Sequence, residues 1–209
     1  MAYTTFTQQN NRRRPAAPAT RRRAPGYFGA AEGLRKSGHL RAAVEEYGKA
    51  VELAPDDAYY RCRYAEALAE SGTTEHAAAQ LETACALDPD NHYYHYKLGH
   101  VYVQAGRIAE AVGALRRATE LAPDDAYYHA RLGSLYFQTG QPQNAVKAFQ
   151  SALRIAPDNP AYHCLIADAY VRIGADRVAL QHYRSAGSLD DYDAAFVAQV
   201  RRLMPPPDR

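Results

Sequence analysis

The sequence predicts an all-α protein built as a solenoid of antiparallel helix pairs. One observation is a 34-residue period, clearest in the near copies that begin at Leu87 and Leu121 and weaker in those that begin at Leu53 and Ile155. A second observation is that glycine, proline and two series of alanines each keep this period separately. A period of this length is typical of repeat arrays, in which each helical unit buries its apolar face against its neighbours.

Three kinds of residue mark where the helices begin and end. A glycine in each repeat follows an amphipathic run, where a helix commonly ends in a left-handed residue. Each proline follows a second such run, and an Asp or Asn stands two residues later, where the next helix needs an acceptor for its free N–H groups. These residues are Gly38, Gly72, Gly106, Gly140 and Gly174; Pro55, Pro89, Pro123 and Pro157; and Asp57, Asn91, Asp125 and Asn159.

These signals predict five helix pairs and a closing helix. First helices are expected at 27–37, 58–71, 92–105, 126–139 and 160–173, and second helices at 41–53, 75–86, 109–121, 143–155 and 177–187. The alanine series that start at Ala43 and Ala50 place small residues where neighbouring helices must approach closely. A further helix at 192–204, apolar on one side, is expected to close the array.

The chain divides into a basic arm and a repeat region. The arm, residues 1–26, contains six arginines, no acidic residue and no apolar periodicity, so it cannot bury enough apolar area to offset its ordering entropy. Because the whole chain carries +2, residues 27–209 carry −4. Five repeats occupy 27–191, followed by the closing helix and a tail at 205–209. The arginines of the arm are Arg12, Arg13, Arg14, Arg21, Arg22 and Arg23.

The repeat resembles the tetratricopeptide repeat (TPR). One copy carries the signature residues His129, Leu132, Gly133, Tyr136, Ala145, Phe149 and Pro157. The resemblance covers residues 27–191 and implies a right-handed superhelix whose concave surface is formed by the first helices. The main departure is at the signature tryptophan position, where the histidines are expected to stack between helices. That position is filled by Tyr27, Arg61, His95, His129 and His163.

The resemblance also implies which residues line the concave surface. The middle of this surface is rich in tyrosine, which offers a large contact area with few rotatable bonds. Tyr60, Tyr94, Tyr128 and Tyr162 are instead expected to cover seams between helices. The candidate partner-binding residues are Tyr59, Glu66, Tyr93, Tyr96, His100, Val103, Tyr127, Ser134, Phe137 and Asp168.

One end of this surface is expected to be acidic, with Glu32, Glu66 and Glu70. We hypothesise that the arginine-rich arm docks there, in the same chain or in a neighbouring subunit. Other roles remain open for the arm, as a solvated tail or as a segment that binds nucleic acid or an anionic membrane. Nucleic acid is less favoured because no aromatic residue is interleaved with the arginines and the rest of the chain is acidic.

Catalysis, metal binding and cofactor binding are not expected. Equivalent histidines of adjacent repeats lie about 8–10 Å apart, too far to share one metal ion. The sequence has no Gly-rich phosphate loop, nucleophile elbow or HExxH motif. Three cysteines without a CxxC motif fit a reducing compartment, and no apolar run is long enough to span a membrane. We therefore expect a cytoplasmic protein, and the Arg- and Ala-rich composition hints at a bacterial source.

The sequence therefore predicts a non-catalytic adaptor that holds a segment of a partner protein along its Tyr-rich concave face. One alternative is a structural subunit that associates with its own copies or with a larger complex, tethered by the basic arm. A second alternative is a nucleic-acid accessory protein that acts through the arm. The spacing of the repeats does not name the partner.

Overall fold

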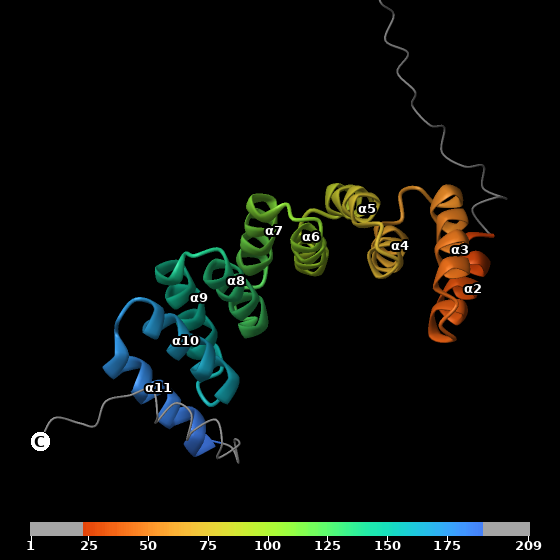
Figure 1. The fold of residues 1–209 in the computed structure, drawn as a ribbon. Coiled ribbons are helices and arrows are strands. Elements are labelled where there is room, and N and C mark those ends of the chain that lie inside the picture. Colours follow the sequence, from red (N-terminus) through yellow and green to blue (C-terminus); the bar gives the residue numbers. More distant parts are fainter. Residues whose placement is uncertain (1–22, 190–209) are drawn as a thin grey trace, which may run out of the picture. The chain divides into compact units, whose positions relative to one another are not determined.

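The computed structural model describes residues 23–189, which form ten α-helices and no strand (Figure 1). The chain divides into two compact units, unit 1 at Met1–Asp88 and unit 2 at Pro89–Arg209. Five of the six arm arginines, the predicted closing helix at 192–204 and the tail at 205–209 lie outside the described residues.

Unit 1 contains two helix pairs. Helix α2 (Ala24–Lys36) pairs with α3 (Leu40–Leu53), and α4 (Ala58–Glu70) pairs with α5 (Thr74–Leu87). The two pairs are joined because α3 also packs against α4. Their shared core consists of Ala31, Ala43, Tyr47 and Ala67, with Phe28, Leu34, Leu40, Val44 and Tyr64 packed around it.

Unit 2 contains three helix pairs. They are α6 (His92–Gln104) with α7 (Ile108–Leu121), α8 (Ala126–Gln138) with α9 (Pro142–Ile155), and α10 (Pro160–Arg172) with α11 (Asp176–Leu189). Successive pairs are joined by α7 packing on α8 and by α9 packing on α10. The core between the last two pairs consists of Ala145, Val146, Phe149, Ile166 and Ala169.

The observed helices confirm the predicted ten, with small differences at their ends. The largest difference is at α2, which begins at Ala24 because Pro25 lies in its first turn, where a missing N–H costs no hydrogen bond. All five predicted glycines end a first helix with φ between 74° and 87°. The residue after each glycine donates its N–H to a carbonyl five residues earlier, as His39 does to Leu34 at 2.9 Å, which closes the helix end.

The predicted capping residues are confirmed at three of four helices. Asp57, Asp125 and Asn159 accept backbone N–H groups from the first turns of α4, α8 and α10. Asn91 has the same extended backbone before α6, but its side chain makes no capping hydrogen bond. The cap at Asn91 was therefore predicted wrongly, although the helix begins where expected.

The small residues lie where helices approach most closely. The two alanine series are confirmed as contact positions, since their members are at most 2% exposed: Ala43, Ala77, Ala111, Ala145, Ala179, Ala50, Ala84, Ala118, Ala152 and Ala186. On α8, a Cβ added to Gly133 would lie 2.6 Å from Cε1 of Phe149, and on α6 one added to Gly99 would lie 2.7 Å from Cγ of Leu115. At both positions the partner side chain occupies the space that an added methyl group would need.

Candidate functional site

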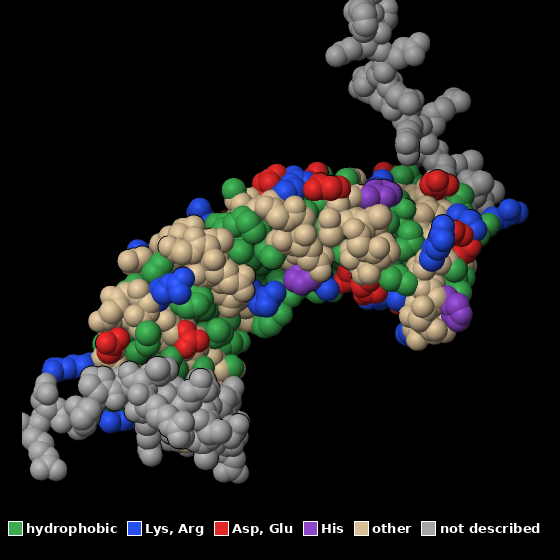
Figure 2. All heavy atoms as spheres, in the orientation of Figure 1, with side chains coloured by type: hydrophobic (Ala, Val, Ile, Leu, Met, Phe, Trp, Pro, Cys, Tyr) green, Lys and Arg blue, Asp and Glu red, His purple; other side chains and the backbone are tan. Residues whose placement is uncertain are grey.

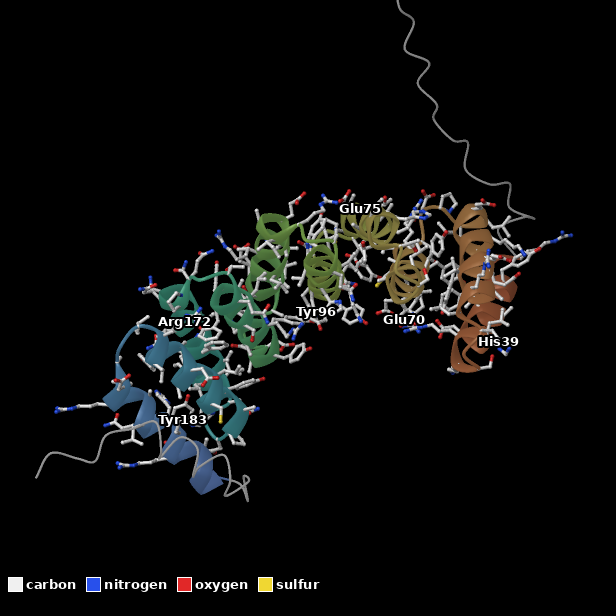
Figure 3. All side chains as sticks on the ribbon, viewed as in Figure 1. His39, Glu70, Glu75, Tyr96, Arg172 and Tyr183 are labelled. Carbon is white, nitrogen blue, oxygen red and sulfur yellow. The ribbon has the colours of Figure 1, made fainter. Side chains whose placement is uncertain are left out.

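A cluster of aromatic side chains lies across the first helices α6 and α8 of unit 2. We call Tyr93, Tyr96, Tyr127 and Tyr128 the tyrosine cluster. Tyr96 stacks on Tyr128 with ring centroids 5.1 Å apart and meets Tyr127 edge-on at 5.5 Å. The hydroxyl oxygens of Tyr96 and Tyr127 lie 2.9 Å apart in a hydrogen bond. Figure 3 marks Tyr96 on α6.

The consecutive tyrosine pairs of α6 and α8 each have one exposed member and one buried member. Tyr93 and Tyr127 are 38% and 48% exposed, whereas Tyr94 and Tyr128 are 7% and 5% exposed. Consecutive residues on a helix point about 100° apart, so the second tyrosine of each Tyr-Tyr pair turns inward when the first faces solvent. Tyr94 and Tyr128 therefore pack as predicted, and Tyr93 and Tyr127 present their rings outward.

Burial favours the neutral forms of Tyr96 and of the neighbouring His100. Burial, followed by the hydrogen bond with Tyr127, raises the pKa of Tyr96 to about 12, so its hydroxyl stays protonated at neutral pH. The Lys97 ammonium lies 5.1 Å above the centroid of the Tyr93 ring. Burial, with the nearby charges of Arg131 and Lys97, lowers the pKa of His100, which favours its neutral form.

A narrow cleft next to the cluster brings four of the predicted residues together. Its lining includes Tyr96, His100, Val103 and Ser134, and its volume of about 40 Å³ suits roughly one water molecule. The Ser134 hydroxyl already donates to the carbonyl of Ala130 at 2.9 Å. The cleft is therefore an extension of the tyrosine surface and not a pocket for a separate ligand.

The remaining predicted residues of unit 2, Phe137 and Asp168, each contact a neighbouring side chain. The guanidinium of Arg172, marked in Figure 3, lies 5.6 Å from the ring centroid of Phe137. Asp168 on α10 accepts a hydrogen bond from the hydroxyl of Tyr183 on α11. Burial, and then this hydrogen bond, raises the pKa of Tyr183.

Unit 1 repeats part of the tyrosine cluster. Tyr59 is 52% exposed and lies next to Phe28, with ring centroids 5.5 Å apart. Phe28 stacks on Tyr60 at 4.3 Å, as Tyr96 stacks on Tyr128 two repeats later. Phe28 was absent from the predicted set, and its place two periods before Tyr96 is the signal that could have found it.

The predicted acidic end of unit 1 is instead an ion-pair network. Arg63 bonds both carboxylate oxygens of Glu32, at 2.9 and 3.0 Å, and also pairs with Glu66. Arg35 bonds both oxygens of Glu70, at 3.1 and 2.6 Å. Glu66 is only 8% exposed, because this network holds its carboxylate. Two guanidiniums offset two of the three negative charges and leave −1.

The same network includes a buried tyrosine. The Tyr47 hydroxyl donates to Glu32, and Tyr47 is completely buried. The hydrogen bond from Arg63 is the largest cause of the lowered pKa of Glu32. Burial raises the pKa of Tyr47 to about 12. On the face of the molecule that Figure 2 shows, acidic and basic side chains are intermingled.

The signature tryptophan position has a bonding role that the sequence did not reveal. The Nε2 atoms of His95, His129 and His163 lie 2.8–3.0 Å from the carbonyl oxygen of the proline six residues earlier. Because a carbonyl can only accept, each imidazole donates. Arg61 donates to Pro55 in the same way, at 2.7 Å. Four of the five residues at this position therefore donate an N–H that ties the helix to the preceding loop.

Two further findings hold for the part of the chain that the structure describes. No group of three or more His, Cys, Asp or Glu side chains is placed to hold a metal ion. None of the described helices is both long enough and apolar enough to cross a membrane.

Comparisons with known proteins agree with the helix pairs. Models described as tetratricopeptide repeat match residues 24–57 and 96–160, and one described as TPR repeat matches 65–106. No curated protein matches the sequence significantly.

Several solved structures of MamA are similar to the chain. A crystal structure of MamA protein is 21% identical with a TM-score of 0.75, and the match covers 83% of this chain and 94% of that one. MamA 41-end from Desulfovibrio magneticus RS-1 is 21% identical, with a TM-score of 0.73 and coverage of 82% and 97%. MamA AMB-1 is 26% identical, with a TM-score of 0.69 and coverage of 85% and 97%. With the matching repeat models and the ten paired helices, these findings show that the chain belongs to the tetratricopeptide-repeat family.

Proposed function

We propose that this protein is a non-catalytic adaptor that binds an extended segment of a partner protein on the first helices of unit 2. Tetratricopeptide repeats form protein–protein interaction scaffolds, so a protein partner is the expected ligand class. The observation that carries the proposal is the outward presentation of Tyr93 and Tyr127. Both rings lie next to that of Tyr96, with centroids 6.4 and 5.5 Å from its own.

The geometry of the cluster suits binding because its aromatic groups are already ordered. The Tyr96–Tyr127 hydrogen bond and the stack of Tyr96 on Tyr128 restrict the rings before any partner arrives. Side chains that are ordered in the free protein lose less entropy on binding, which improves affinity. The neutral hydroxyls can exchange hydrogen bonds with a peptide backbone, while the ring faces cover apolar side chains.

The test is affinity capture by the full chain and by a Tyr93→Ala/Tyr127→Ala variant, with quantitative mass spectrometry of the recovered proteins. Hot-spot truncations cost about 2 kcal/mol or more, so partner recovery should fall by at least about tenfold. A Val178→Ala variant, which trims an exposed apolar side chain on α11, should recover the partners of the wild type. Equal recovery by the tyrosine variant would show that the cluster is not the binding surface.

The ion-pair network weighs against the hypothesis that the arm docks on the acidic end of unit 1. An arginine of the arm would have to displace Arg35 or Arg63 from carboxylates that already form bidentate pairs. Light scattering of the full chain and of a variant without residues 1–22 separates the adaptor from the self-assembling subunit. A single monomeric mass for both supports the adaptor, and a larger species that needs the arm supports the assembly subunit.

A further inference from the structure

A second surface of unit 2 is a groove formed by the second helices α7 and α9 with α8 at its floor. We call it the α7–α9 groove, and its volume is about 320 Å³. It contains no residue of the tyrosine cluster. Its lining consists of Arg116, Thr119, Glu120, His129, Leu132, Tyr136, Asn144, Lys147, Ala148 and Ser151.

The side chain at the position of Ala148 differs in size between repeats: Ala114, one repeat earlier, is also an alanine, whereas two other repeats carry larger side chains. Two repeats earlier, in unit 1, the position holds Gln80, whose amide oxygen accepts from Arg61 at 2.7 Å. One repeat later it holds His182, whose Nδ1 lies 3.0 Å from that of His163. Those side chains reach Arg61 and His163 at the signature tryptophan position, whereas the methyl group of Ala148 makes no hydrogen bond with the equivalent His129.

The polar groups of the groove favour a negatively charged ligand. Arg116 on α7 and Lys147 on α9 are exposed, and neither takes part in an ion pair within the described residues. Glu120 is the one acidic residue of the lining. Its carboxylate lies 3.6 Å from the guanidinium of Arg117, a residue that does not line the groove. The groove therefore presents two cations that form no ion pair with the described residues, beside one carboxylate that is paired with Arg117.

The floor of the groove adds a histidine with a fixed orientation. His129 donates from Nε2 to the carbonyl of Pro123 at 3.0 Å, which leaves Nδ1 as the hydrogen-bond acceptor of the neutral ring. In the next repeat the equivalent His163 directs Nδ1 at His182, the residue that corresponds to Ala148. By this equivalence, Nδ1 of His129 faces the open space above Ala148, where it can bond a ligand N–H group.

We propose that the α7–α9 groove binds an acidic segment of a protein partner. An Asp or Glu carboxylate lies between Arg116 and Lys147, and the backbone beside it passes over Ala148 and offers an N–H to His129. The volume is at the lower end of the range for ligand pockets, roughly 300–1,000 Å³, which fits a short stretch of peptide. The proposal does not depend on the tyrosine cluster, so each surface can be tested without the other.

The experiment measures fluorescence anisotropy of a rhodamine-labelled, C-terminally amidated octapeptide of alternating Glu and Ser, titrated with the full chain. The Glu peptide should bind, and the same peptide with Gln in place of Glu should bind at least about fivefold more weakly, as expected for two partly exposed ion pairs. Ala148→Gln, which copies the side chain at Gln80, should fill the groove and weaken binding by about tenfold or more, since a hot-spot loss has this size.

Charge variants and a matched control complete the design. Arg116→Gln/Lys147→Gln should weaken binding of the Glu peptide, while Arg184→Gln should not, although Arg184 occupies the position equivalent to Arg116 two repeats later. Circular dichroism checks that every variant remains helical. The proposal is overturned if the Glu and Gln peptides bind alike, or if Ala148→Gln leaves the affinity unchanged. It is also overturned if the chain binds a single-stranded octathymidylate through Arg116 and Lys147 but does not bind the Glu peptide.

Discussion

Gly133 on α8 allows the closest approach to a second helix in unit 2, and Gly133→Ala tests that packing directly. The added Cβ would lie 2.6 Å from Cε1 and 2.7 Å from Cδ1 of Phe149 on α9. Carbon atoms in contact prefer separations of about 3.5–4.0 Å. Phe149 is 1% exposed and packs among the core residues of the last two helix pairs, so its ring cannot move out into solvent. The two helices of the pair must therefore separate, or the ring must leave its preferred rotamer.

Two opposing effects set the size of the change. Alanine is favoured over glycine in a helix interior by about 0.8–1.0 kcal/mol. Overpacking a filled core costs about 1–3 kcal/mol. Gly133→Ala should therefore lower the free energy of unfolding by about 0–2 kcal/mol, as the difference of these two terms. Gly113, an exposed glycine inside α7 with no atom within 4 Å of an added Cβ, provides the matched control. Gly113→Ala gains only the higher helix propensity of alanine and should stabilise the protein.

The assay is urea unfolding followed by far-UV circular dichroism. The difference between the two glycine variants cancels the gain in helix propensity and should equal the overpacking cost of about 1–3 kcal/mol. Gly133→Ala/Phe149→Leu recreates the Ala65 and Leu81 pair of the second repeat, and should recover part of the loss. The packing argument is refuted if Gly133→Ala stabilises the protein as much as Gly113→Ala does.

Two further predictions concern charged groups. Arg63→Met should lower the free energy of unfolding by about 1–3 kcal/mol, because the buried Glu66 carboxylate then keeps only its longer contact with Arg35. The control is Lys49→Met, at an exposed ion pair, which should leave the urea midpoint unchanged. Acid should destabilise the chain, since burial lowers the pKa of His182 and of His100 below 6.5. The unfolded state then binds more protons, so this stability is complete above pH 6.5 and is lost as the pH falls through the folded-state pKa values. The urea midpoint should decrease as the pH is lowered through that range, and it should decrease less steeply in His182→Gln. A midpoint independent of pH would contradict the assignment of this acid sensitivity to the buried histidines.

The helices were predictable because their ends are set by local signals that recur in every repeat. A glycine such as Gly38 takes a left-handed conformation through its own lack of a side chain, and a proline interrupts a helix through its own ring. Neither effect needs a distant contact. Asn91 is the exception, because whether a side chain caps a helix depends on its rotamer and its other neighbours as well as on its position.

The candidate site was predictable only in part. The outward direction of Tyr93 and Tyr127 follows from helical spacing once the inner tyrosine of each pair is assigned to packing. Glu66 pairs with Arg63, three residues before it on the same helix, and with Arg35, which lies 31 residues away on another helix. Periodicity identifies which face a residue occupies, but it does not show which opposite charge reaches it across two helices.

The sequence by itself determined the repeat period, the ten helices and the small residues at their contacts, since each of these depends on the conformation or size of a single residue at a recurring position. The tertiary structure alone decided which carboxylates were already paired and where space remained open. Arg63 reaches Glu32 only when α2 and α4 lie together, and Ala148 leaves a groove only because α7 and α9 face each other across it. Pairing and empty volume are relations between helices, which a linear sequence does not contain.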